Sequence, residues 1–386
     1  MTTTFRLSVL ALIGVFAVLP GALRGSDSAI AGAKAKLIIF DWEYYKPKEY
    51  YADFEEKHPG VADVKTKADD AAIFDAVNLN EHADIIHPYT TWLKRWVDSG
   101  LVREIDVGKL ANWPKVPEEL KAIGRCGLPD PDQPSNQSGR NKIGELVCSP
   151  DLNGKQFFVP WDVGFSSILY LKTDEVGEIN SWKELFNERY EGHISMYDDD
   201  GLSAVEVYSY AYPDERLSYD EGKITTEQFA EKNRVAWTEQ KKLVLDYWKG
   251  DDEQKIIDGM VAGNIWLAYA WPSAYAALKD KGVKVGYAKP IEGRISWVGA
   301  YGILERAKDY PLALEFLDEK LSTRTAESVV ELGYGVANKD VWSRHSNATL
   351  KDLSLNDWSV LKETNFPPEL TAEQIDAWNL MWSQVK

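Results

Sequence analysis

Cysteine and histidine are scarce in this chain of 386 residues, which contains two Cys and five His. The histidines lack the spacing of a zinc or other metal site, because they are scattered at His58, His82, His87, His193 and His345. The sequence also lacks a Gly-x-Ser-x-Gly elbow, a phosphate-binding loop and a dinucleotide fingerprint. We therefore expect no metal, no cofactor and no catalytic site of these kinds.

Basic charge is also in short supply, with 44 Lys and Arg against 61 Asp and Glu and a formal net charge of -17. Nucleic acids need a basic patch for their phosphates, and anionic lipids attract basic segments. The charge balance argues against both as partners and is compatible with a cationic ligand. Acidic surfaces also serve solubility, so the net charge does not by itself identify a site.

Long apolar runs are confined to the N-terminal region. Residues 7–19 are apolar, follow Arg6 and precede Pro20 and small residues, which is typical of a signal peptide. The segment 29–31 fits the small-x-small cleavage rule, and 20–22 offers an earlier cleavage region. No other segment is long enough for a membrane span. We expect residues 1–31 to be a signal peptide and the mature protein to be soluble and periplasmic.

The two cysteines flank a polar stretch rich in Pro, Gly, Ser and Asn. An even number of cysteines in an exported protein favours a disulfide between Cys126 and Cys148. Closing a loop of this size would contribute roughly 3 kcal/mol. Two free buried thiols or a metal pair are the alternatives.

Short apolar runs alternate with helical patterns through the first third of the chain. Strand-helix alternation of this kind predicts a parallel sheet with helices on both faces. The expected strands are 36–41, 61–66 and 83–88, and the expected helices begin at Pro47, at Asp69 or Asp70, and after Tyr89.

The middle of the chain has the same alternation. Residues 156–171 read as two strand-like runs broken at Pro160, and 225–250 read as one long helix ending at Gly250. Ser181 and Glu184 predict a capping box. Further strands are expected at 192–200, 263–271, 283–290 and 295–304, with a helix beginning at Pro272.

Aromatic and acidic residues recur where these strands end. The run LIIFDWEYY at 37–45 shows the pattern, and the chain as a whole has 15 Trp and 19 Tyr. In open α/β sheets, ligands bind beyond the carboxyl ends of the strands. We therefore predict a ligand cleft, and assign Trp237 and Trp248, which lie on a helical pattern, to the core. The strand-end residues are Trp42, Tyr45, Tyr89, Thr91, Trp92, Trp161, Asp162, Asp198, Asp199, Asp200, Trp271 and Trp297.

From about residue 35 to the C-terminus the chain resembles the periplasmic polyamine-binding proteins, the spermidine/putrescine receptors of ABC importers. The segments that carry the resemblance are FDWEYYKP at 40–47, ADIIHPYTTWLKRWVDSGLVREID at 83–106, FFVPWDVGFSSILY at 157–170, SWKELF at 181–186, WLAYAWPSAY at 266–275, KPIEGRISWVGAYGIL at 289–304 and ELGYGVAN at 331–338.

The resemblance implies an α/β, bilobal periplasmic solute-binding protein fold with a hinge and a central ligand cleft. Lobe 1 would comprise 35–165 plus 298–342, and lobe 2 would comprise 166–297 plus 343–386. It also implies that an alkylamine lies between aromatic rings with carboxylates on its ammonium groups. By position, the ligand-binding residues would be Trp42, Tyr45, Tyr89, Thr91, Asp200, Trp271 and Trp297.

Two family acids are missing, because their positions are occupied by Ser203 and Gly299. Trp161 and Asp162 follow a strand and are added to the expected ligand-binding residues, and Asp199 or Glu206 are further substitutes for the missing acids. Arg294 adds a cation near Trp297, either as a ligand contact or as a surface arginine.

We therefore expect a non-enzymatic receptor of an ABC importer that binds a small organic cation, polyamine-like, and works with a membrane permease. A monomer is expected. The first alternative is a receptor for a quaternary ammonium, sulfonium or zwitterionic compound such as a betaine, because these cations need an aromatic cage more than carboxylates. Arg294 would then hold a carboxylate. The second alternative is an exported glycoside hydrolase, since clefts lined with Trp and paired carboxylates also suit sugars.

Overall fold

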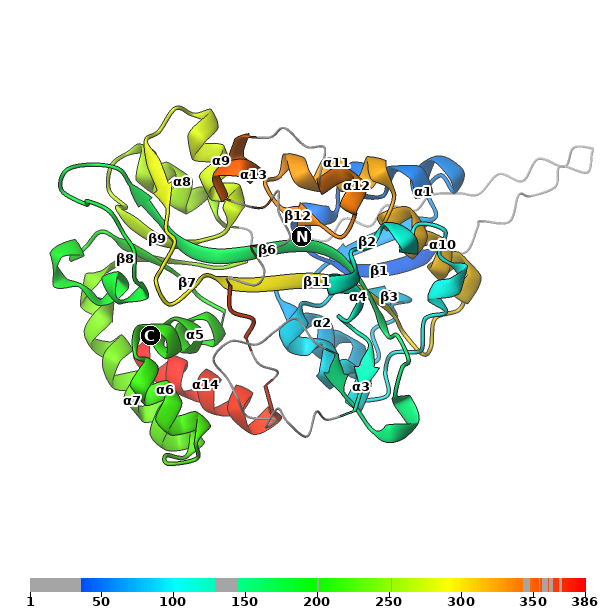
Figure 1. The fold of residues 1–386 in the computed structure, drawn as a ribbon, viewed down its shortest axis with the longest axis horizontal. Coiled ribbons are helices and arrows are strands. Elements are labelled where there is room, and N and C mark those ends of the chain that lie inside the picture. Colours follow the sequence, from blue (N-terminus) through cyan, green and yellow to red (C-terminus); the bar gives the residue numbers. More distant parts are fainter. Residues whose placement is uncertain are drawn as a thin grey trace, which may run out of the picture. The chain divides into compact units, whose positions relative to one another are not determined.

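The computed structural model describes residues 36–386 except 129–144, 200, 251, 343–347, 354, 356–359, 361–363, 368 and 369. Its central feature is a ten-stranded sheet (Figure 1). The path through the sheet is β2-β1-β3-β11-β6-β9-β7-β8, and β10 and β12 also pair with β6. The predicted α/β class is confirmed. The strands are β1 Leu37–Asp41, β2 Ala62–Thr66, β3 Ile85–Ile86, β6 Phe158–Leu171, β7 Ile194–Tyr197, β8 Val244–Trp248, β9 Leu267–Ala270, β10 Val285–Tyr287, β11 Ile295–Ile303 and β12 Gly335–Val336, with β4 Cys126–Gly127 and β5 Leu146–Val147 in a separate pair.

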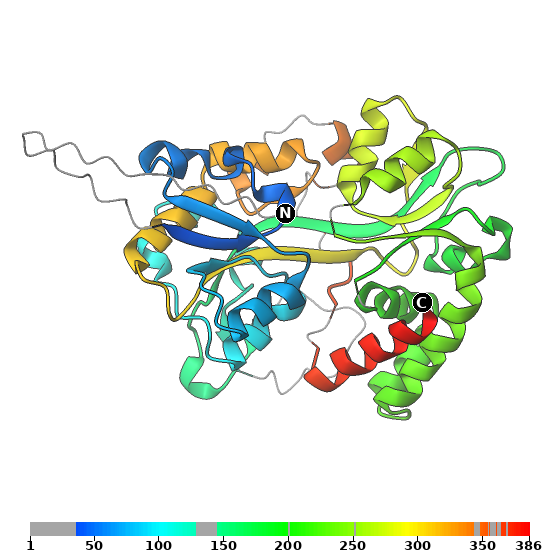
Figure 2. The same ribbon diagram turned by 180° about the vertical axis from the view of Figure 1, so that it is seen from behind.

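Helices connect and flank these strands, and α14 lies beside α7 when the molecule is seen from behind (Figure 2). The α-helices are α1 Ala52–Lys57, α2 Asp70–Asn78, α3 Leu93–Asp98, α4 Glu118–Lys121, α5 Leu202–Ala211, α6 Pro213–Asp220, α7 Thr226–Gln240, α8 Gln254–Val261, α9 Pro272–Asp280, α10 Tyr310–Lys320, α11 Thr323–Glu331, α12 Lys339–Trp342, α13 Ala348–Leu353 and α14 Ala372–Val385. In the part of the chain that the structure describes, no helix combines the length and apolar character that a membrane crossing requires.

Two groups of parallel strands are joined by two long antiparallel strands. Strand β1 pairs in parallel with β2 and β3, and β7 pairs in parallel with β8 and β9. The long strands β6 and β11 pair with each other in antiparallel fashion. Strand β11 also pairs with β3 of the first group, and β6 also pairs with β9 of the second group. Figure 1 shows them running from the β1–β3 group to the β7–β9 group.

Pro160 does not break the strand, contrary to the sequence-based expectation. Residues Phe158–Leu171 form one strand of 14 residues, and Pro160 lies opposite Ala300 where the register with β11 shifts. Proline lacks a backbone donor and is tolerated at such a bulge. The amide of Ala300 donates to the carbonyl of Pro88, which lies just after β3.

The long helix expected over 225–250 ends early. Helix α7 stops at Gln240, a short 3-10 turn follows, and residues Val244–Trp248 form β8. The run VLDYW is rich in β-branched and aromatic residues, so pairing with β7 overrides the helical periodicity. Trp237 and Trp248 are nevertheless both fully buried, as predicted.

Local signals at two helix starts had different outcomes. Asp69 caps α2 by accepting a hydrogen bond from the Ala72 amide at 2.7 Å. Ser181 accepts from the Lys183 amide, but it begins a 3-10 helix, Trp182–Phe186, in place of the α-helix that a capping box implies.

The predicted disulfide between Cys126 and Cys148 is present and joins the β4–β5 pair.

Candidate functional site

A cavity of about 500 Å³ lies where the two strand groups face each other. Its walls come from the segments that follow β1, β2 and β3, and from the ends of β7, β8 and β9 with the start of α5. Residues 295–297 of β11 form part of the floor. The strand-end rule therefore predicted the place of the cavity correctly.

Aromatic rings form two linked clusters on the cavity walls. On one side, Tyr89 lies 4.9 Å from Trp42 and 5.1 Å from Trp297, measured between ring centroids. On the other side, Trp271 lies 5.1 Å from Tyr197 and 6.3 Å from Tyr44. Edge and tilted contacts of this kind fix the rings while leaving faces for a ligand.

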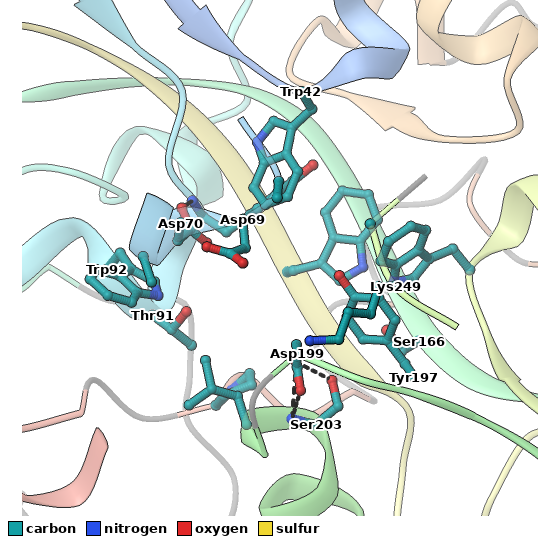
Figure 3. Close-up of a pocket in the computed structure, with 18 of the residues that line it drawn as sticks. Trp42, Asp69, Asp70, Thr91, Trp92, Ser166, Tyr197, Asp199, Ser203 and Lys249 are labelled. Carbon is teal, nitrogen blue, oxygen red and sulfur yellow. Dashed lines mark hydrogen bonds between the residues drawn. The ribbon is translucent and has the colours of Figure 1, made fainter. Parts of the chain in front are cut away.

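Acidic side chains outnumber basic ones among the described residues that line the cavity. Figure 3 shows Asp69 and Asp70 at one side, and Asp199 beside Ser203 at another. Asp70 accepts from the Tyr89 amide at 3.1 Å, and Asp199 accepts from the Ser203 amide at 2.9 Å. The acids are Glu43, Asp69, Asp70, Asp199 and Glu206, and the basic residues are Lys67 and Lys249.

Two of these carboxyl groups resist ionisation. Burial, helped by the charge of Asp69, raises the pKa of Asp70 well above its usual value despite the hydrogen bond from Tyr89. Burial and the charge of Asp199 likewise raise the pKa of Glu206. A cation placed between the two acidic pairs would offset both effects, so the cavity is electrostatically suited to positive charge.

Six of the ten expected ligand-binding residues line the cavity, three do not, and Asp200 lies outside the described residues. Those at the cavity are Trp42, Tyr45, Tyr89, Thr91, Trp271 and Trp297. Those away from it are Trp161, Asp162 and Arg294, all of them buried.

Arg294 neither reaches the cavity nor lies on the surface. Its guanidinium donates to the backbone carbonyls of Tyr287, Ala288 and Leu353 and packs over the Phe165 ring. Burial lowers its pKa to about 10, so it stays charged. Three of its N–H groups are used by carbonyls, so the guanidinium joins segments of the fold and is not among the residues that line the cavity.

Asp162 lies directly behind the cavity wall in a buried charge cluster. Its carboxylate accepts from the Tyr45 hydroxyl at 2.6 Å, the Tyr89 hydroxyl at 3.3 Å and His87 Nε2 at 3.0 Å. The other ring nitrogen of His87 lies 2.7 Å from Asp41. Trp161 stacks edge-on against Tyr45 at 4.6 Å and donates its indole N–H to the Lys320 carbonyl.

The structure shows which side chains surround Ser203 and Gly299, the two positions where family acids are missing. Ser203 donates its hydroxyl to Asp199 at 2.6 Å, so an acid still stands beside it. A Cβ on Gly299 would meet Asp162 Oδ1 at 2.0 Å and His87 Nε2 at 2.4 Å. The Asp162–His87 pair thus occupies the space that a side chain at 299 would need.

Several cavity residues were not among the expected ligand contacts. Asp69 and Asp70 follow β2, and Tyr197 ends β7, so the strand-end rule applied to these strands would have found them. Lys249 follows β8, which was hidden by the helical reading of 225–250. Tyr334 lies in the segment 331–338 that carries the resemblance, but it was not predicted as a ligand contact because no strand was expected there and β12 joins the sheet only in the tertiary structure. The described residues hold no group of three or more His, Cys, Asp or Glu placed to bind a metal.

Comparison with known proteins identifies similar sequences over most of the chain. Residues 49–352 match the family model described as bacterial extracellular solute-binding protein. The spermidine/putrescine-binding periplasmic protein of Escherichia coli (strain K12) is 23% identical over 335 residues, which is 82% of each chain. The putrescine/cadaverine-binding protein of Pseudomonas aeruginosa is 22% identical and spans 94% of this chain and 96% of that one.

Solved structures share the fold at low sequence identity. The TpPotD lipoprotein of Treponema pallidum aligns with a TM-score of 0.70 at 17% identity, covering 91% of this chain and 99% of that chain. The spermidine/putrescine substrate-binding protein PotD of Streptococcus pneumoniae aligns with a TM-score of 0.65 at 15% identity, covering 91% and 100%. The predicted bilobal α/β fold is therefore confirmed, and so is the resemblance to the polyamine-binding proteins.

Proposed function

Because the chain belongs to the bacterial extracellular solute-binding protein family, we propose that it is the extracytoplasmic receptor of an ABC importer and captures a small, polyamine-like organic cation. The observation that carries the ligand class is the pair of acidic groups, Asp69 with Asp70 and Asp199 with Glu206, in a cavity walled by aromatic rings. Like charges held together in a buried site favour a cation between them, and aromatic faces add attraction.

The relatives support this assignment by their names, which give spermidine, putrescine and cadaverine as what those proteins bind. Within the site we assign ligand contacts to Trp42, Tyr45, Tyr89, Thr91, Asp200, Trp271 and Trp297. Rings would enclose the alkyl chain while carboxylates hold its charged ends.

A quaternary ammonium or sulfonium ligand is the second candidate. The aromatic rings around Trp271 and Trp297 would suit a cation without N–H groups. A zwitterion such as a betaine is less well served, because the Arg294 guanidinium is occupied by three backbone carbonyls.

The proposal also covers the location of the protein, its partner and its division into lobes. We place the mature protein in the periplasm after loss of residues 1–31, working as a monomer with a membrane permease and no enzymatic activity. The lobes would be 35–165 plus 298–342 and 166–297 plus 343–386. Strands β6 and β11, which run through both, would form the hinge.

A ligand panel tests the function. Purified protein is screened by thermal shift and calorimetry against polyamines, quaternary and sulfonium cations, betaines, amino acids and sugars. A ligand at a hundred times its Kd stabilises the fold by roughly 2.7 kcal/mol, which a melting curve resolves. We expect polyamines to give the largest shifts. Stabilisation by sugars alone, or turnover of chromogenic glycosides, would contradict the proposal.

An Asp200→Asn variant separates the two cation classes. An ammonium that pairs with this carboxylate should lose at least about tenfold in affinity, whereas a caged quaternary cation should lose less. Asp174→Asn, at an exposed acid away from the cavity, is the matched control and should leave binding unchanged.

A further inference from the structure

The bulge in β6 brings two consecutive side chains into one buried cluster. In a regular strand Trp161 and Asp162 would point to opposite faces of the sheet. At the register shift opposite Gly299 and Ala300, both instead contact Tyr45 and His87. Asp162 is fully buried, and it accepts hydrogen bonds from Tyr45 and Tyr89, which line the cavity.

The cluster is fixed from several sides. The His87 ring stacks on Tyr301 with centroids 4.1 Å apart, and the Tyr301 hydroxyl donates to Asp41 at 2.6 Å. His87 bridges Asp41 and Asp162 through its two nitrogens. If both carboxylates are ionised they can only accept, each ring nitrogen that faces one then carries hydrogen, and the ring is an imidazolium. Burial lowers the pKa of His87, but the two carboxylates outweigh burial and raise it to about 9.

The hydroxyl groups of Tyr45 and Tyr89 donate their hydrogens to the carboxylate of Asp162, at 2.6 Å and 3.3 Å. Both donate to Oδ2 of Asp162, while Oδ1 accepts from His87. A phenol has a single hydrogen, so once it is donated the oxygen can only accept. Tyr45 and Tyr89 also line the cavity, where they would meet the ligand.

We propose that Asp162, held by His87, is a positioning residue that makes Tyr45 and Tyr89 acceptor-only, so that the cavity selects cations bearing N–H groups over fully methylated ones. This inference rests on the proposed function, since it refines how the same site recognises its cation. Asp162 acts through the tyrosines and does not touch the ligand. A donated hydrogen bond from a phenol to a carboxylate also increases the negative character of the phenolic oxygen.

The Asp162–His87 pair fills the space beside Gly299, which leaves no room for a side chain at this position. Any side chain there would collide with the Asp162–His87 pair, at 2.0 Å from the carboxylate and 2.4 Å from the imidazole. The imidazolium faces the carboxylates of both Asp41 and Asp162, so each carboxylate has a cationic partner, although the three groups together carry one net negative charge.

The test compares ligands that differ only in N–H groups. Calorimetry measures the Kd of 1,4-diaminobutane and spermidine, each against its fully N-methylated counterpart, for the wild-type protein and for Tyr89→Phe, Tyr45→Phe and Asp162→Asn. We expect the wild type to prefer the unmethylated member by about tenfold or more, since hydrogen bonds to charged groups are the stronger ones. Each variant should lose most of that preference by weakening only the unmethylated ligand.

Tyr170→Phe is the matched control, because the Tyr170 hydroxyl also donates to a carboxylate, Glu178 at 2.6 Å, but lies away from the cavity. It should leave both affinities unchanged. Folding of each variant is checked by melting temperature, and if Asp162→Asn does not fold, the two tyrosine variants decide.

The outcomes are separable. Binding of cations with an unchanged preference in the variants, or a parallel loss for both members of a pair, would overturn the positioning role and leave the receptor function standing. Absence of binding for all four compounds by the wild type would contradict the proposed function and this inference with it.

Discussion

At the scale of single residues, the protonation of His87 is directly measurable. Its pKa of about 9 arises because Asp41 and Asp162 together outweigh the effect of burial. We expect ¹⁵N NMR to show both ring nitrogens protonated at pH 7.5, where an ordinary histidine is neutral. The urea-unfolded protein, in which the same residue should titrate near its ordinary value, is the control. A neutral ring at pH 7.5 in the folded protein would contradict the assignment.

NMR is preferable to melting curves for measuring the pKa of His87, because the titration of Lys320 changes stability in the opposite direction over the same pH range. A raised folded pKa means that the stability contributed by His87 is fully present below about pH 6.5 and is lost as pH rises through about 9. Lys320 acts in the opposite sense. Burial is the main reason that its pKa falls to about 7, so the unfolded chain binds a proton that the folded chain does not between about pH 7 and 10.5. The two effects oppose each other between pH 7 and 9.

The tryptophans divide into two classes by location. Trp42, Trp271 and Trp297 are partly exposed at the cavity, whereas Trp237 is fully buried. Replacing any of the first three by Ala should weaken cation binding by about tenfold or more, since each face-on contact contributes about 0.5–2 kcal/mol besides apolar contact. Trp237→Ala should lower the free energy of unfolding by about 3–5 kcal/mol with little change in Kd.

Calorimetry and denaturant unfolding measure the two quantities independently. Trp237→Ala thus serves as the control for the cavity variants. Small and equal effects on Kd at all three cavity tryptophans would mean that these rings serve packing alone.

At the scale of elements, the pairing of β6 with β11 depends on a position without a side chain. Gly299→Ala would place Cβ against Asp162 and His87, both buried and fixed by hydrogen bonds. We expect the free energy of unfolding to fall by about 1–3 kcal/mol, as for other forced overpacking. Denaturant unfolding with an unchanged m-value is the measurement.

Gly108→Ala is the matched control. A Cβ at Gly108 meets only the carboxylate of Asp106, at 3.2 Å, and that side chain is exposed and held only by a surface ion pair with Lys109. Its effect should be within about 0.5 kcal/mol, the usual range for a surface substitution. Equal stabilities of the two variants would show that the Asp162–His87 pair can move aside.

At the scale of the whole molecule, the proposed lobes should close on the ligand. The cavity is lined by residues from both strand groups, so a ligand that contacts both walls binds the closed arrangement better and shifts the population toward it. Small-angle scattering should give a smaller radius of gyration at saturation with the ligand that the panel identifies. A non-binding sugar at the same concentration is the control, and no decrease at saturation would argue against hinge closure.

Local sequence patterns predicted many of the secondary-structure elements and the place of the cavity. Short apolar runs and helical patterns predicted most strands and a helix start at Asp69 or Asp70, and the even cysteine count in an exported chain predicted the disulfide between Cys126 and Cys148. These features depend on nearby residues and on composition. The accumulation of aromatic and acidic residues at strand ends predicted the place of the cavity, because parallel strands end at a common edge.

Tertiary structure decided what local patterns could not. Pairing with β7 made residues 244–248 a strand although their periodicity continued a helix. Arg294, which the sequence alone left between a ligand contact and a surface position, donates to two carbonyls at 287 and 288 and to the distant carbonyl of Leu353. The bulge opposite Gly299 turned Asp162 inward to His87 and the two tyrosines. Strand ends and helix caps are set by neighbours in sequence, whereas the direction of a side chain at a bulge and the partner of a buried charge are set by whichever distant segment fills the space beside them.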